Sequence, residues 1–297
     1  MFYRKSSHIG FIGLGNMGGY MAGNLLKSGH KLHVYDISRK ACDVLEAKGA
    51  TVYTRTTDLA KNSKIVITML PNNSVVNASY DEMISEGVKK GTVFLDCSTI
   101  SSELAKSLQK RISLKGGTFL DAPVSGGVPG AAEATLTFMV GGRENDFKAV
   151  KDILQCMGKR IIHCGSHGMG QAAKLCNNMM LAISMLAVSE TMNLAVGQGL
   201  DARIFAEILN SSTGCCWTSE SYNPVPGITA LTKANNVPIS LINKDLELVV
   251  NAASSSESPI AMGLLTHKIY SSLITQGLGD LDFSDVYSLM ESNNFKY

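Results

Sequence analysis

The feature that most constrains the fold of this chain is a short apolar strand that runs directly into a glycine-rich turn. The strand is predicted over His8 to Gly13, and the turn opens a helix that ends at Ser28-Gly29-His30. A second strand, Lys31 to Tyr35, ends in Asp36. A strand, a G-x-G-x-x-G turn, a helix and a second strand ending in an acid predict a βαβ unit that binds a dinucleotide.

The residue types of this unit also indicate which dinucleotide it binds. Glycines permit a tight turn and a close backbone approach, and the helix N-terminus faces the pyrophosphate. The predicted cofactor contacts in the turn are Gly13, Leu14, Gly15, Asn16, Met17 and Gly18. Asp36 is expected to accept the ribose hydroxyls and to repel a 2′-phosphate, while Arg39 lies past the end of the strand. The sequence therefore favours NAD over NADP.

Strands and helices continue to alternate up to residue 164. Helices are predicted at 38–48, 57–62 and 144–157, and further strands at 51–53, 64–69, 92–95, 118–121, 136–140 and 160–164. This alternation predicts an α/β Rossmann-type domain over residues 1–164. Loops at the carboxyl ends of its strands are where such sheets bind ligands, so Leu70, Pro71 and Thr99 are candidate cofactor contacts. The competing interpretation is that these residues only form ordinary loops and bind no ligand.

A second glycine-containing segment follows the strand at 118–121. Ser125, Gly126 and Gly127 place exposed backbone N–H groups beside a hydroxyl. Such a segment is suited to hold a carboxylate or phosphate oxygen. We therefore expect it to contact the substrate.

The stretch from Gly165 to Asn178 begins with three glycines and continues as a long apolar helix, predicted over 171–197. Lys174 and Asn178 lie four residues apart, so both point from one face of this helix. An ammonium and a carboxamide placed in this way could bind the same small polar molecule. The alternative is that Lys174 extends along the surface and Asn178 caps a neighbouring group.

No strand is predicted after Gly165, so residues 165–297 are expected to form an all-α domain. Further helices are predicted at 202–210, 240–255, 260–276 and 283–291. Lys244, followed by Asp245 and Leu246, falls in the first turns of an otherwise apolar helix. It is the candidate to meet the cofactor from this domain.

Composition excludes several classes of partner. The net charge is only +2 and no basic run occurs, which argues against nucleic acid or a membrane surface. Apolar stretches are interrupted short of a membrane span. The charged fraction is 18% and the hydrophobic fraction 45%, which favours burial of surface in a homodimer or homotetramer. Seven cysteines without a CxxC pair indicate free thiols and no metal site.

Four separated motifs resemble the β-hydroxyacid dehydrogenase family. They are the run Gly10 to Gly18, the run Asp121 to Gly127, the stretch Gly165 to Asn178, and Lys244-Asp245-Leu246. The resemblance implies a Rossmann domain joined by a long helix to a helical domain, with the active site in the cleft between them. It also implies that Lys174 is catalytic, that Ser125, Gly126 and Asn178 bind a small hydroxyacid, and that Leu70, Pro71, Thr99 and Lys244 lie near NAD.

Three segments refine this resemblance. Cys216-Trp217 and the loop Asn223 to Gly227 are similar to animal members, which implies the mitochondrial matrix, or the cytoplasm if the source is bacterial. Ala134 stands where the family usually has glycine, and its methyl group is expected to require a negative φ. The segment Asn235 to Ser240 is shorter than its family counterpart, which alters the expected pocket wall.

The implied chemistry is hydride transfer from an alcohol to NAD, with a lysine as the base that takes the hydroxyl proton. Burial and a neighbouring cation can make a lysine suitable for this role near neutrality. Two alternatives stay open. A reductase of another small semialdehyde or of glyoxylate would share every motif. A non-catalytic NAD-binding oligomerisation module would be expected to lack the lysine, and Lys174 is present.

Overall fold

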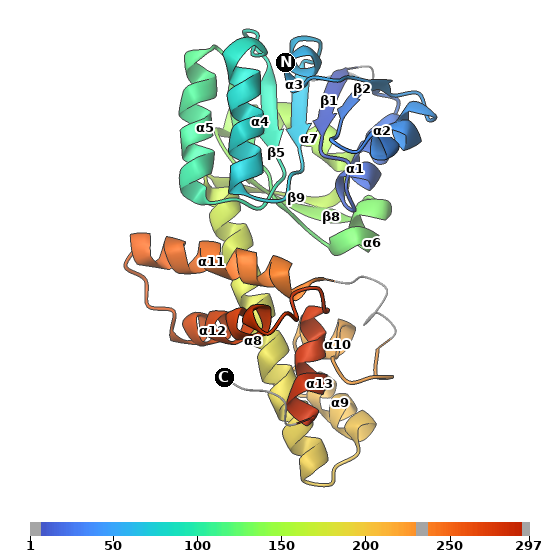
Figure 1. Cartoon of the computed structure of the whole chain (residues 1–297), viewed down its shortest axis with the longest axis vertical. Coiled ribbons are helices and arrows are strands. Elements are labelled where there is room, and N and C mark those ends of the chain that lie inside the picture. Colours follow the sequence, from blue (N-terminus) through green and yellow to red (C-terminus); the bar gives the residue numbers. More distant parts are fainter. Residues whose placement is uncertain (1–6, 230–236, 293–297) are drawn as a thin grey trace. The chain divides into compact units, whose positions relative to one another are not determined.

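The computed structural model describes residues 7–229 and 237–292, and it divides into two compact units, Met1–Lys174 and Leu175–Tyr297. The predicted Rossmann-type α/β domain followed by an all-α domain is confirmed. A long helix, α8 (Met169–Gly197), contributes residues to both units (Figure 1). The predicted boundary at residue 164 falls at the end of the last strand.

The first unit is built on a nine-stranded sheet in the order β3-β2-β1-β4-β5-β6-β8-β7, with β9 paired to β8. Strands β1 to β6 are parallel to one another, whereas β8 runs antiparallel to β6 and β7. The chain reverses its direction of winding between β1 and β4, the position at which open α/β sheets bind ligands. The strands are β1 (His8–Ile12), β2 (Lys31–Tyr35), β3 (Thr51–Val52), β4 (Ile65–Thr68), β5 (Val93–Asp96), β6 (Thr118–Asp121), β7 (Val124–Ser125), β8 (Leu136–Gly141) and β9 (Gly158–Gly165).

Helices cover both faces of this sheet (Figure 1). Alternate side chains of β4 explain why: Ile65 and Ile67 join one buried cluster, while Val66 joins the other. A strand buried on both faces is what a parallel sheet with crossover helices requires. The helices of this unit are α1 (Gly18–Lys27), α2 (Arg39–Glu46), α3 (Thr56–Lys61), α4 (Asn73–Glu86), α5 (Ser102–Leu114), α6 (Gly127–Ala132) and α7 (Glu144–Gln155).

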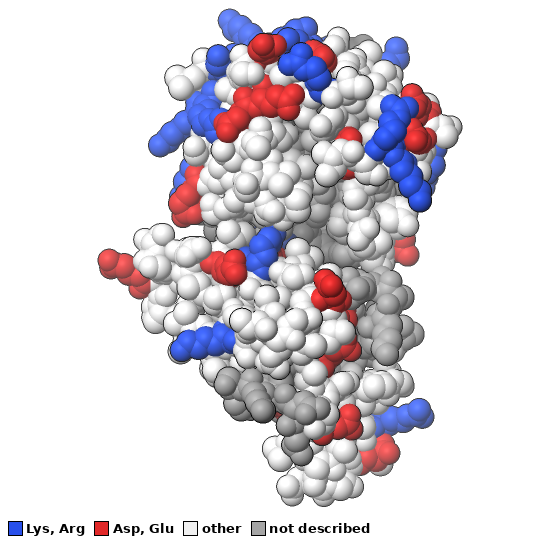
Figure 2. Space-filling model, in the orientation of Figure 1, with Lys and Arg blue, Asp and Glu red and all other residues white. Residues whose placement is uncertain are grey.

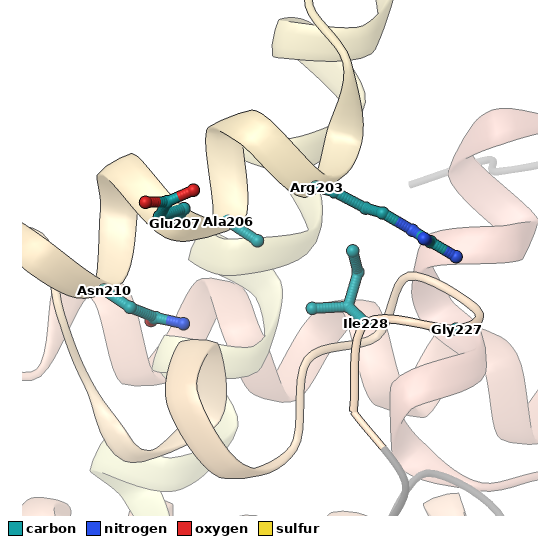
Figure 3. Close-up of a pocket in the computed structure, with 6 residues that line it drawn as sticks. All are labelled: Arg203, Ala206, Glu207, Asn210, Gly227 and Ile228. Atoms are coloured by element: carbon teal, nitrogen blue, oxygen red, sulfur yellow. The ribbon is translucent and has the colours of Figure 1, made fainter.

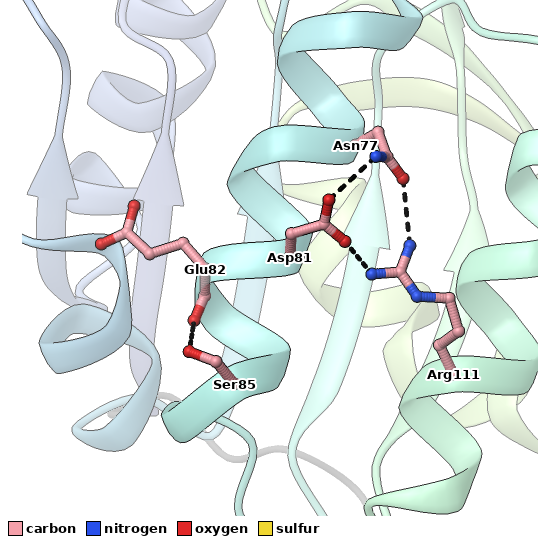
Figure 4. Close-up of polar contacts among 5 residues, drawn as sticks. All are labelled: Asn77, Asp81, Glu82, Ser85 and Arg111. Atoms are coloured by element: carbon pink, nitrogen blue, oxygen red, sulfur yellow. Dashed lines mark hydrogen bonds and ion pairs between the residues drawn. The ribbon is translucent and has the colours of Figure 1, made fainter.

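Helices α4 and α5 and the short strand β7 are absent from the prediction made from the sequence. The two helices lie side by side and are linked by Arg111 of α5, which pairs with Asp81 and donates to Asn77 Oδ1 at 3.0 Å (Figure 4). Asn77 in turn donates to Asp81 at 2.9 Å. Helix α4 alternates small polar and apolar residues without a strong amphipathic stripe, so its periodicity signal is weak.

The second unit contains no strand among its described residues, as predicted. Its helices are α9 (Ala202–Ser211), α10 (Trp217–Ser221), α11 (Ile239–Ser255), α12 (Ala261–Thr275) and α13 (Val286–Glu291), with a 3₁₀ turn at Phe283–Asp285. Met185 and Leu186 of α8 pack in one cluster with residues of α11 and α12. The short α10 lies in a segment that the sequence predicts to be a loop.

Helix α8 also corrects an expectation about membranes. Its mean hydropathy reaches 1.6 over eighteen residues, so among the described residues this one helix has the length and composition of a membrane span. The expectation that no such stretch occurs is therefore wrong. Only 39% of that window is buried within the chain. The core helix of a soluble protein satisfies the same two criteria.

Ala134 adopts a left-handed conformation, with a φ of 55°, which contradicts the expectation of a negative φ. Helix α6 ends at Ala132, and the Thr135 N–H reaches back to the Gly130 carbonyl at 2.9 Å. This bond closes a Schellman motif, which needs a left-handed residue at the position of Ala134. A glycine adopts this backbone conformation without strain, whereas the methyl group of an alanine makes it less favourable by about 1 kcal/mol.

Candidate active site

The glycine turn after β1 has the geometry of a dinucleotide cradle. Gly13 has a φ of 92°, and a Cβ there would come within 2.2 Å of the Met69 carbonyl oxygen. A Cβ on Gly18 would lie 1.9 Å from the Gly13 carbonyl oxygen, so only glycine allows α1 to begin this close to the turn. A Cβ on Gly15 would meet nothing within 4 Å. The open side of the turn is therefore at Gly15, where a phosphate can approach the backbone.

Asp36 closes this cradle from the end of β2. Its carboxylate accepts the Leu14 N–H at 2.6 Å and the Ser38 N–H at 2.7 Å. Asn16 is exposed and Met17 half-buried at the N-terminus of α1, which has no side-chain cap. The unit therefore places an acid and a set of backbone donors beside one another, as binding of a ribose and a pyrophosphate requires.

Leu70, Pro71 and Thr99 lie where the sequence predicts them, just past the carboxyl ends of β4 and β5. The two strands are neighbours in the sheet, with Thr68 paired to Asp96. The Leu70 N–H donates to the Ser98 hydroxyl at 2.9 Å, so the two loops are joined by a direct hydrogen bond. Leu70 and Thr99 are half-buried and Pro71 is exposed.

The segment Ser125 to Gly127 joins β7 to α6. Gly126 and Gly127 both have positive φ, 133° and 62°, and both are exposed, while Ser125 is half-buried. Ser125 is held in register with Thr137 of β8. Exposed backbone beside a hydroxyl fits the predicted carboxylate contact.

Helix α8 carries the candidate catalytic pair. Lys174 is 9% exposed and Asn178 is 7% exposed, one turn apart on the helix. Burial of both polar side chains on one helix favours the functional interpretation of this pair, because a buried lysine is costly.

Asp245 in the second unit organises two of the predicted residues. The Asn178 amide donates to Asp245 Oδ2 at 2.6 Å, and Lys244 Nζ lies 2.9 Å from Asp245 Oδ1 in an ion pair. Asp245 is only 4% exposed. This acid thus holds the Asn178 carboxamide in one orientation and leaves its second N–H for another acceptor.

The comparisons with known proteins show the family to which the chain belongs. A family model described as the NAD binding domain of 6-phosphogluconate dehydrogenase matches residues 8–165, and one described as NAD-binding of NADP-dependent 3-hydroxyisobutyrate dehydrogenase matches residues 168–290. The mitochondrial 3-hydroxyisobutyrate dehydrogenase of Drosophila melanogaster is 64% identical over 295 residues, which is 98% of this chain and 91% of the relative. The chain belongs to the 3-hydroxyisobutyrate dehydrogenase family. It is thus an NAD-binding oxidoreductase of the family that the four motifs indicated.

Two further relatives of this family bear on the substrate. The solved structure of the Mycobacterium tuberculosis 3-hydroxyisobutyrate dehydrogenase with L-serine has a TM-score of 0.90 at 38% identity, covering 96% of this chain and 99% of that one. The NAD-dependent L-serine dehydrogenase of Pseudomonas aeruginosa is 41% identical over 290 residues, covering 95% of this chain and 97% of the relative.

Two buried acids that sequence reasoning missed lie at the ends of strands whose loops are predicted to contact the cofactor. Asp96 and Asp121 end the neighbouring strands β5 and β6, are paired in register, and are fully buried. Burial raises the pKa of Asp96 to about 7, although hydrogen bonds from Thr68 and Ser98 act in the opposite direction. Burial also raises the pKa of Asp121, although the hydrogen bonds that it accepts from the Gly168 and Gln171 N–H groups act to lower it. An acid at a strand end is visible in the sequence, but its burial is not.

The histidines beside the glycine turn of α8 have structural partners. His163 Nε2 lies 2.8 Å from the Gly142 carbonyl oxygen, and His167 Nε2 lies 3.0 Å from that of Phe119. All seven cysteines are free thiols in the structure. Among the described residues, no group of three or more metal-ligating side chains gathers.

A hollow of about 380 Å³ in the second unit contains none of the predicted site residues. It lies between α9 and the loop that follows Pro226 (Figure 3). The shortened segment before Lys244 falls partly at residues 235–236, which lie outside the described residues.

Proposed function

We propose that this protein oxidises 3-hydroxyisobutyrate to methylmalonate semialdehyde, a step of valine breakdown, with NAD as the hydride acceptor. The observation that carries the proposal is the 64% identity to the Drosophila enzyme over 98% of the chain. All four motifs of the family are present, and each lies in a structural setting that suits its role.

In this proposal Lys174 is the general base. It takes the proton of the substrate hydroxyl as the hydride leaves the carbon that bears this hydroxyl. In the reverse direction it returns the proton to the oxygen. The hydride is the only group that NAD must accept. A base of this kind contributes about 10²- to 10⁴-fold to the rate.

The substrate carboxylate is bound by the backbone N–H groups of the segment Ser125 to Gly127 and by the Asn178 amide. The positive φ of both glycines and the orientation of Asn178 by Asp245 support this assignment. Fixing the carboxylate determines which carbon faces the ring.

NAD is held by the turn from Gly13 to Gly18, with the pyrophosphate at the open side of Gly15. Asp36 accepts the ribose hydroxyls, and Leu70, Pro71, Thr99 and Lys244 contact the nicotinamide half. A carboxylate repels a 2′-phosphate, so the arrangement at Asp36 supports a preference for NAD over NADP.

L-Serine is the second candidate substrate, because two relatives are named with it. It has the same hydroxymethyl and carboxylate groups as 3-hydroxyisobutyrate and carries an ammonium in place of the methyl. An ammonium must be paired when buried, whereas a methyl needs an apolar wall. Comparing kcat/KM for the two substrates therefore tests whether the pocket contacts this substituent with polar or with apolar groups.

The decisive experiment combines a substrate panel with a lysine variant. NADH absorbance is followed while 3-hydroxyisobutyrate, L-serine, 3-hydroxypropionate, 4-hydroxybutyrate and glycerate are offered. We expect the highest kcat/KM for 3-hydroxyisobutyrate. A higher value for serine would assign the protein to the serine branch, and a net preference for reducing glyoxylate or a semialdehyde would establish the reductase alternative.

Lys174→Met should lower kcat by about 10²- to 10⁴-fold and leave NADH binding, measured by fluorescence, within about 3-fold. The exposed Lys159→Met is the matched control and should change neither quantity. Retention of more than half of kcat by Lys174→Met would show that another group is the base. No oxidation by the unmodified protein, with intact NADH binding, would favour the non-catalytic module.

We also propose that the protein is a homodimer or homotetramer. Of the eighteen exposed large hydrophobic side chains among the described residues, twelve lie in the second unit. On the face shown in Figure 2, this unit presents mostly uncharged atoms. Eight of these twelve side chains lie on α8, α9 and α12, among them Met180, Leu194, Ile204, Ile208, Met262 and Leu265. Light scattering that gives a monomer mass at micromolar concentration would contradict this assignment.

The mitochondrial matrix is the proposed location, supported by the mitochondrial name of the Drosophila relative. Immunofluorescence or fractionation of source cells against a matrix marker tests it.

A further inference from the structure

Gln171 is a fully buried side chain that the proposed reaction does not use. It lies in the first turn of α8 and is 0% exposed. Its Nε2 donates to the Ser98 carbonyl oxygen at 2.8 Å, and its Oε1 accepts the Ile100 N–H at 3.1 Å. The nitrogen and the oxygen of one carboxamide are thus hydrogen-bonded to the two residues that flank Thr99. The position of the Thr99 backbone is therefore set by α8.

The backbone of Gln171 is itself held from the opposite side. Its N–H donates to Asp121 Oδ2 at 3.0 Å, and the Gly168 N–H donates to Asp121 Oδ1 at 2.7 Å. A Cβ on Gly170 would lie 2.3 Å from the Met139 carbonyl oxygen, so the turn packs directly on the sheet. The start of α8 is therefore fixed to the end of β6 and cannot adjust when the contacts of Gln171 are lost.

Ser98 extends the contact to the second cofactor loop. Its hydroxyl accepts the Leu70 N–H at 2.9 Å and donates to Asp96 Oδ1 at 2.7 Å. Ser98 is also 0% exposed. A continuous chain of hydrogen bonds thus runs from α8 through Gln171 and Ser98 to the Leu70 backbone.

We propose that Gln171 is a positioning residue that holds the Thr99 loop, and through Ser98 the Leu70 loop, at a set distance from the turn of α8 that bears Lys174. The proposal rests on the proposed function for the roles of Thr99, Leu70 and Lys174. Because its side chain is fully buried and bonded to Ser98 and Ile100, Gln171 acts through the backbone of these two residues. Misplacement of reacting groups by about 1 Å costs on the order of 10²-fold in rate, so a linkage of this kind acts on kcat.

Gln171→Met tests the linkage with a side chain of similar length that forms neither hydrogen bond. We expect kcat to fall by about 10²-fold while KM for NAD changes by less than about 3-fold, because Gly13 to Gly18 and Asp36 still hold the other half of the cofactor. Ser98→Ala should lower kcat by about 10-fold. Ser63→Ala is the matched control: Ser63 is also a buried serine of the sheet unit, it donates to the Leu59 carbonyl oxygen at 2.7 Å, and its loss should leave kcat unchanged.

Gln171→Glu supplies a readout that general destabilisation would not produce. A neutral carboxyl can still accept the Ile100 N–H and donate to the Ser98 carbonyl, whereas a carboxylate places a negative oxygen against that carbonyl. The titratable groups near this site are Asp96 and Asp121 at the strand ends, Lys106 of α5, His167 and Lys174. We expect the kcat ratio of this variant to the unmodified enzyme to fall by about 10-fold or more from pH 6 to pH 9.

A measurement without substrate separates this inference from the proposed function. Hydrogen exchange of the Ile100 amide in the apo protein should be at least about 10-fold faster in Gln171→Met than in Ser63→Ala, because only the first loses the acceptor of that amide. Unchanged Ile100 exchange, or a kcat of Gln171→Met above half that of the unmodified enzyme, would overturn the positioning role. Faster exchange in a protein that oxidises no hydroxyacid would refute the proposed function and leave the linkage without a catalytic consequence.

Discussion

The buried carboxyl of Asp96 should make the stability of this protein depend on pH in a direction opposite to that of most acids. Asp96 has a pKa of about 7, raised by burial from its ordinary value of 3.8. The folded state therefore holds the proton more tightly than the unfolded chain does. Its contribution to stability is fully present below pH 3.8 and is lost as the pH rises through 7.

The magnitude follows from the two pKa values. Between pH 5 and pH 8 the difference in proton affinity corresponds to about 2 to 3 kcal/mol of unfolding free energy. Asp96→Asn removes the titration and keeps an oxygen that can accept from Thr68 and Ser98. The unfolding free energy of the variant should therefore rise by about 2 to 3 kcal/mol relative to that of the unmodified protein on going from pH 5 to pH 8.

Urea unfolding at fixed protein concentration, followed by circular dichroism at pH 5, 6, 7 and 8, measures this difference. Taking the variant minus the unmodified protein at each pH cancels the contribution of titratable groups that do not interact with Asp96. Asp152→Asn, at an exposed position of α7, is the control and should give a difference that is constant with pH. A constant difference for Asp96→Asn would show that its carboxyl is not buried as described.

Three further results are expected. Asp36→Ala should lower the ratio of kcat/KM for NAD to kcat/KM for NADP by roughly 10- to 100-fold. The substitution removes a charged hydrogen-bond acceptor for the ribose and the repulsion of a 2′-phosphate. Equal kcat/KM for both cofactors in the unmodified protein would refute this reasoning. Ala134→Gly should raise the unfolding free energy by about 0.5 to 1 kcal/mol by relieving the left-handed alanine, whereas Ala132→Gly, at the last residue of α6, should not raise it. 3-Hydroxypropionate, which lacks one methyl, should have a kcat/KM roughly 10- to 200-fold below that of 3-hydroxyisobutyrate, and comparable values would show that no apolar wall contacts the methyl.

The sequence alone is sufficient for the architecture and for the location of most candidate residues. A glycine turn between a strand and a helix has a geometry that few other residue types allow, so the pattern of residue types is enough to place Gly13, Gly18 and Asp36. The same holds for Lys174 and Asn178, because helical periodicity determines which residues share a face. These are local properties, and a local pattern carries them.

The tertiary structure decided which hydrogen-bond partners the polar side chains of the site have. Asp245 contacts Asn178 across sixty-seven positions of chain, and Gln171 contacts Ser98 across seventy-three. Nothing in the local pattern around Gln171 distinguishes it from any other polar residue in the first turn of a helix. Its role depends on burial and on partners that are distant in sequence, and neither has a periodicity that can be read from a single chain.

The backbone of Ala134 illustrates the same division. The sequence shows an alanine where the family has glycine, and the expected negative φ is the choice that costs an alanine least. The structure has a positive φ because the end of α6 requires a left-handed residue to close the bond from Thr135 to Gly130. The sequence thus determined which segments form the fold and which residues can carry the chemistry. Burial, long-range hydrogen bonds and the strain that they impose were decided only when distant segments packed together, because those free energies arise from contacts between residues that are far apart in the chain.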